Sequence, residues 1–156
     1  MTLVALLVLF VGAAVVAATV VVRSQKKSYA RANEVIPGRA TKAPAEWAGA
    51  HTPEARMHRR LRDALEALRA NPAMEDAFML DARVSLEEQA VAVDERLIAA
   101  AALPEGVRAE PLARLAPAVD AVEAAVAALV TEPQRSGVER AMADVQQRMT
   151  ALEQGS

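Results

Sequence analysis

An uninterrupted apolar run at the N-terminus, residues 2–22, limits what this chain can fold into more than any other feature. It reads TLVALLVLFVGAAVVAATVVV and contains no charged residue. As a helix with a rise of ~1.5 Å per residue, a run of this length would extend roughly 31 Å, about the thickness of the hydrocarbon core of a bilayer. We therefore predict a transmembrane signal-anchor helix over residues 1–23.

A cleaved signal peptide is the competing interpretation of this run. Signal peptides carry positive side chains before an apolar segment of about 7–15 residues. Here no Lys or Arg precedes the apolar run, and the run is longer. Ala17 and Ala18 would suit a cleavage site, but the apolar residues continue to Val22. We expect an uncleaved anchor.

Four basic residues follow the span, namely Arg23, Lys26, Lys27 and Arg31, and none precedes it. Because positive charge is retained on the cytoplasmic side, this asymmetry predicts an outside N-terminus and a cytoplasmic C-terminal domain at the cell membrane. The inverted topology is the alternative. The same side chains are expected to contact anionic headgroups of the lipid bilayer, at about 1 kcal/mol each near the surface.

The charge of the remaining chain is divided between two regions. Residues 23–62 carry a net charge of +7, and residues 63–156 carry −9. Residues 24–51 show no helical periodicity and contain Pro37-Gly38, a pair typical of tight turns. We predict a basic, irregular juxtamembrane linker over 24–51. Trp47, the single tryptophan, is expected to dock on the following domain; a lipid-interface position or a partner contact are the other possibilities.

Residues 52–154 are predicted to form a soluble all-α bundle of three or four antiparallel helices. Thr52-Pro53-Glu54 has the cap, proline and acid typical of a helix start. A second helix is expected over 72–103, with a possible break near Val84. It shows two apolar stripes, which indicate a central helix with neighbours on both sides.

Two later segments repeat apolar residues at alternating spacings of three and four, the pattern of a helix–helix seam. We expect Thr131 to Gln134 to open the last helix, and Pro117 to cause a kink or a late helix start near Ala116. The first seam contains Leu112, Leu115, Val119, Val122, Val126 and Leu129; the second contains Val138, Met142, Val145, Met149 and Leu152.

Residues able to perform chemistry are few. There is no cysteine, and the two histidines, His51 and His58, make a zinc site improbable. We expect His58 to be a surface residue. Glu87 and Asp94 are expected on a solvated face, where Arg83 pairs with Glu87. No phosphate loop or nucleophile elbow is present. We predict no catalytic residue, no metal, no cofactor and no nucleic-acid partner.

The chain is rich in Ala, Arg, Val and Glu, and its most distinctive stretch runs from Asn33-Glu34-Val35-Ile36-Pro37-Gly38 to Trp47-Ala48-Gly49. In composition and overall organisation it resembles small single-pass membrane proteins of unknown function from high-GC actinobacteria. The resemblance covers less than a fifth of the chain and implies no activity.

These patterns favour a non-enzymatic, membrane-tethered interaction or scaffold module that binds a protein partner or a second copy through its helix faces. An accessory subunit of a larger membrane complex, with the span itself as interface, is one alternative. A ligand-sensing bundle with an internal pocket is the other.

Overall fold

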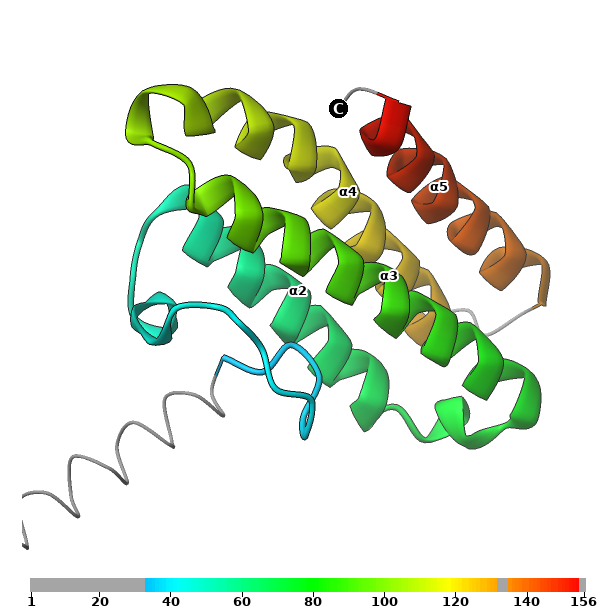
Figure 1. Ribbon diagram of the computed structural model, residues 1–156. Coiled ribbons are helices and arrows are strands. Elements are labelled where there is room, and N and C mark those ends of the chain that lie inside the picture. The colour runs from blue at the N-terminus through cyan, green and yellow to red at the C-terminus, as the bar shows by residue number, and fades with distance from the viewer. Residues whose placement is uncertain (1–32, 132–134, 155–156) are drawn as a thin grey trace, which may run out of the picture.

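The computed structural model describes residues 33–131 and 135–154, and this part of the chain is helical without strands (Figure 1). It contains the helices α2 (Pro53–Ala70), α3 (Ala77–Ala101), α4 (Glu105–Thr131) and α5 (Arg135–Gln154). Two short 3-10 helices accompany them, η1 (Ala45–Ala48) and η2 (Pro72–Glu75). The predicted all-α bundle is confirmed.

The predicted anchor, residues 1–23, and the basic residues Arg23, Lys26, Lys27 and Arg31 lie outside the described residues. Within 33–131 and 135–154, no helix combines the length and the apolar character needed to cross a bilayer.

Successive helices of the bundle run antiparallel, and α4 contacts each of the other three (Figure 1). Helices α2 and α3 form a hairpin beside it, and α5 packs along α4 and α3 on the other side. Helix α3 likewise contacts each of the other three, so the prediction of a second helix with neighbours on both sides is confirmed.

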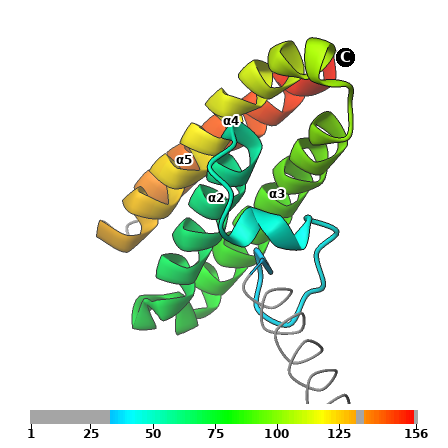
Figure 2. The same ribbon diagram turned by 90° about the vertical axis from the view of Figure 1, so that its left-hand side faces the viewer.

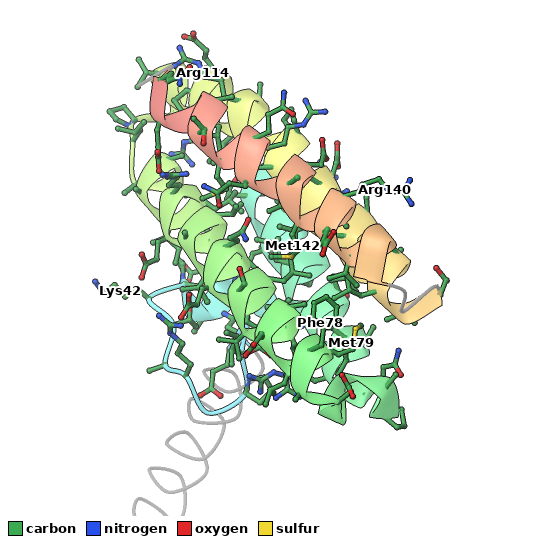
Figure 3. The ribbon with its side chains drawn as sticks, turned by 90° about the vertical axis from the view of Figure 1, so that its right-hand side faces the viewer. Lys42, Phe78, Met79, Arg114, Arg140 and Met142 are labelled. Atoms are coloured by element: carbon green, nitrogen blue, oxygen red, sulfur yellow. The ribbon has the colours of Figure 1, made fainter. Side chains whose placement is uncertain are left out.

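The two predicted seams form the interior. All six seam residues of α4 are buried, and on α5 Val138, Val145 and Met149 are buried while Met142 and Leu152 pack partly buried against the same core. Met142 lies on the inner side of α5 (Figure 3). Because both seams are used inside the bundle, neither is left to pair with another molecule.

The boundary between the first two helices differs from the prediction of one helix over 72–103. Two polar side chains divide the segment: Asn71 Oδ1 accepts the Ala73 N–H at 3.0 Å, and Asp76 Oδ1 accepts the Phe78 N–H at 3.0 Å. Each thus satisfies a backbone donor at a helix start. From Ala77 onward α3 is continuous, and it does not break near Val84.

Of the two effects expected of Pro117, the late helix start near Ala116 is wrong, because α4 begins at Glu105 and contains both Pro111 and Pro117. Thr131 ends α4 instead of opening the next helix, and its hydroxyl donates to the carbonyl of Ala127 at 2.7 Å. Helix α5 begins at Arg135.

Candidate functional site

The described part of the predicted linker, residues 33–51 and called the neck below, packs against the bundle. It contains no α-helix, as predicted, but several of its side chains are buried. Figure 2 shows the neck crossing over α2 and α3. Lys42 extends from it away from the helices (Figure 3).

The neck is folded back on itself by its own polar groups. The Asn33 side chain, 0% exposed, donates from Nδ2 to the Pro44 carbonyl at 2.6 Å. The Glu34 carboxylate accepts the N–H of Gly38 at 2.8 Å, and Gly38 has a φ of 85°. Only glycine adopts that backbone conformation without steric cost. The Pro37-Gly38 turn is closed by the Arg39 N–H, which donates to the Ile36 carbonyl at 3.0 Å.

Apolar neck residues cover half of one of the two apolar stripes on α3, the stripe formed by Leu80, Val84, Val91 and Ile98. Val35 and Ile36 are buried in the core cluster, and with Val91 and Ile98 they line a small cavity of about 70 Å³. The other half of the stripe, Leu80 and Val84, is 38% and 44% exposed. The second neighbour that this stripe indicated is thus the neck rather than another helix.

A buried polar cluster joins the neck to both helices of the hairpin. His58 on α2 and Asp94 on α3 meet at 2.6 Å between Nδ1 and Oδ1. Since a carboxylate has only acceptors, Nδ1 carries the proton and donates. The Thr41 hydroxyl donates to the other Asp94 oxygen at 3.4 Å. Trp47 lies edge-on to the His58 ring, with centroids 5.3 Å apart.

Two hydrogen bonds from Arg59 fix the C-terminal end of the neck. The terminal nitrogen of Arg59 donates to the carbonyls of Trp47 at 2.7 Å and of Ala50 at 2.6 Å. One guanidinium thus satisfies two backbone acceptors, one in η1 and one in the turn that leads into α2. Trp47 itself is 4% exposed and lies against the bundle.

The expectations for His58 and for the carboxylates were wrong. His58 is 0% exposed, because it continues the buried face of Leu61 and Leu65 one turn towards the N-terminus. Asp94 and Glu87 are also buried, at 4% and 7% exposed, rather than solvated.

The expected ion pair of Arg83 with Glu87 is present, but the shorter contacts of Glu87 come from Arg69 on α2. Arg69 donates to both its oxygens, at 2.6 and 2.9 Å, while Arg83 Nε stands 3.7 Å away. The bidentate contact raises the pKa of the Arg69 guanidinium. A similar link joins α2 to α4, where Arg60 donates to Glu123 and Asp120; these bonds raise its pKa above the usual value.

The His58–Asp94 pair has the geometry of a general base with its orienting carboxylate, but it is closed to substrates. His58 Nε2 is buried and has no hydrogen-bond partner. A catalytic base needs to reach a proton on a substrate, directly or through one water. In residues 33–131 and 135–154, no group of three or more His, Cys, Asp or Glu side chains is placed to hold a metal ion. The pair links α2 to α3, and Thr41 and Trp47 of the neck contact it.

A wider cleft lies next to this cluster, on the side of the α3–α4 turn. Its walls come from neck residues 44–50, the start of α2, the last turn of α3 and Arg108 of α4, and it encloses about 370 Å³. Glu54 reaches into it and is 6% exposed. A terminal nitrogen of Arg108 stands 3.8 Å from the Glu54 carboxylate. Sequence inspection did not single out this pair.

Fold and site together define the class: a small antiparallel helical bundle with its N-terminal segment strapped across the first hairpin. Compared with known protein families, curated proteins and solved structures, the chain matches none of them.

Proposed function

We propose that the protein is a membrane-tethered helical interaction module, without catalytic activity, that presents its bundle to a protein partner at the cytoplasmic face. The docked neck carries this proposal. Ten residues, 23–32, separate the apolar run from the first buried neck residue, Asn33. Ten residues extend at most ~35 Å. An anchor over 1–23 would therefore keep the bundle beside the bilayer.

The charge division supports the same arrangement. The region after the predicted span carries +7, and the chain from residue 63 onward carries −9. The anionic inner leaflet attracts basic segments and repels acidic ones within about a Debye length. The neck end would face the lipid, and the acidic helices would face the cytoplasm, where a partner can reach them.

The exposed half of the α3 stripe is the surface we assign to the partner. Leu80 and Val84 lie on one face of α3 and stay exposed, whereas the seams of α4 and α5 are used internally. The two exposed aliphatic side chains continue the line of apolar residues that the neck covers further along α3. Such a surface is suited to packing against the apolar face of a partner helix.

Site-specific photocross-linking of the full chain in native membranes tests this proposal. A photoreactive residue at position 84 should give a discrete adduct with a partner or a second copy. The same residue at position 107 is the matched control, because Val107 is also an exposed valine, 58%, but lies on the first turn of α4. Equal labelling from both positions, or none from 84, contradicts the assignment.

Two further tests separate this function from its alternative. Replacing residues 2–22 by an unrelated span should leave the adduct at position 84 intact; its loss would favour an accessory subunit that uses the span as its interface. A C-terminal reporter active on one side of the membrane should report the cytoplasm. An outside signal would refute the proposed location.

A further inference from the structure

The cleft around Glu54 and Arg108 contains charged groups that the protein leaves incompletely satisfied. Glu54 is more than nine-tenths buried, yet its contact with Arg108 is 3.8 Å long, beyond hydrogen-bond range. Arg108 Nε is buried with no hydrogen-bond partner. The Thr52 side chain, at the cap position of α2, makes no capping bond. A buried ion pair is favourable only when its remaining donors and acceptors are satisfied.

These groups open onto a space large enough for a ligand. The volume of about 370 Å³ falls in the ~300–1,000 Å³ range of small-molecule sites. Apolar side chains form the remaining wall, including Trp47 and Ile98. A mostly apolar pocket with a few convergent polar groups is the usual composition of a binding site.

We infer that this cleft binds a small zwitterion with an apolar body, namely an aliphatic α-amino acid. The ligand ammonium would donate to the Glu54 carboxylate, and the ligand carboxylate would accept from the Arg108 guanidinium. Such a ligand places a cation and an anion side by side, which matches the 3.8 Å separation of the two protein groups. Its aliphatic side chain would pack against Trp47 and Ile98.

Binding would also strengthen the attachment of the neck. One wall of the cleft belongs to neck residues 44–50, and the others belong to three helices. A ligand that touches all of them stabilises the docked arrangement over any arrangement in which the neck is released. The inference does not depend on the membrane anchor or on the partner surface, so it can fail or succeed independently of the proposed function.

Titration of the full chain in detergent micelles with L-leucine tests the inference. Trp47 is the single tryptophan and lines the cleft, so its emission reports binding directly. We expect a saturable change with leucine. Two analogues with the same isobutyl group, 3-methylbutylamine and 4-methylpentanoate, each lack one of the two charged groups and should bind at least tenfold more weakly. No saturable change with leucine at millimolar concentrations, or equal binding of either analogue, overturns the inference.

Matched variants localise the site. Glu54→Gln and Arg108→Met should each weaken leucine binding at least tenfold, whereas Glu110→Gln, on the exposed side of α4, should not change it. Retained binding in both cleft variants overturns the assignment. If either variant fails to fold by circular dichroism, the analogue series on the native chain still decides. Glycerophosphoethanolamine presents the same two charges as a lipid headgroup; binding of this compound without leucine binding would refute the amino-acid assignment.

Discussion

Removing the Asp94 carboxylate should release the neck before the bundle unfolds. In Asp94→Ala, the Nδ1–H of His58 loses its acceptor at a position that is 0% exposed. An unsatisfied buried donor costs ~1–3 kcal/mol. The 3.4 Å bond from Thr41, which joins the neck to Asp94, is lost as well. We expect a total cost of about 2–3 kcal/mol.

Asp94→Asn is the matched control, because its amide oxygen can still accept from Nδ1. It should cost ~1 kcal/mol, the difference between a hydrogen bond to a charged group and one to a neutral group. Replacing both partners, as in His58→Phe with Asp94→Leu, removes the unsatisfied donor together with the acceptor. The double variant should therefore be more stable than Asp94→Ala, with a coupling of ~1–3 kcal/mol between the two positions.

The assay is urea unfolding of the full chain in micelles, followed by two probes. Trp47 emission reports the neck, since this tryptophan is the only one and lies against His58. Circular dichroism reports the helices. In Asp94→Ala the emission transition should move to lower urea than the helical transition, as local unfolding of the least stable segment requires. Coincident transitions, or equal costs for Ala and Asn at position 94, would refute the reasoning.

The remaining predictions concern the bundle itself. Leu129→Ala, at a 0% exposed seam position, should cost ~2–5 kcal/mol in chemical unfolding, whereas Val84→Ala should stay within ~0.5 kcal/mol; similar costs would contradict the packing. Arg60→Gln should cost less than ~1 kcal/mol and lose its effect in high salt, because the bridges to α4 are partly exposed. The hydrogen bond from Arg114 lowers the pKa of Glu110 below its usual 4.5. The pair therefore stabilises the fold fully when the pH is above 4.5, the pKa of Glu110 in the unfolded chain. This stabilisation is lost as the pH falls through the lower pKa of Glu110 in the folded chain. Acid titration of the Glu110 carboxyl by NMR should give a midpoint below 4.5, and Arg114→Gln should bring it back.

Some of the buried polar residues could have been predicted from the sequence by extending the apolar pattern of α2 towards its N-terminus. Leu61, Leu65 and Leu68 repeat at four and three, and the same spacing continued backward reaches His58 and Glu54, both of which are buried. On α3 the stripe of Val91 and Ile98 likewise passes through Asp94. Charge alone had placed His58 and Asp94 at the surface, because ionisable side chains are rarely buried without partners. The partners come from distant segments, which the spacing cannot show.

The prolines of α4 show a different limit of sequence reasoning. Proline disfavours a helix interior because it lacks an N–H and its ring crowds the preceding turn. Nevertheless α4 runs through Pro111 and Pro117. Packing of its seam against three other helices outweighs the local cost of the prolines. Tertiary burial decided the extent of this helix.

The sequence by itself determined the helical class, the approximate positions of the helices and the faces they bury, because these follow from local propensity, caps and a repeating apolar pattern along one segment. Only the tertiary structure decided that the neck is packed, that His58 meets Asp94 across 36 positions of sequence, and that Glu54 and Arg108 share a cleft. Such contacts join segments whose spacing in the chain carries no information about their distance in space. Their stability depends on the burial and hydrogen bonding that the assembled bundle creates.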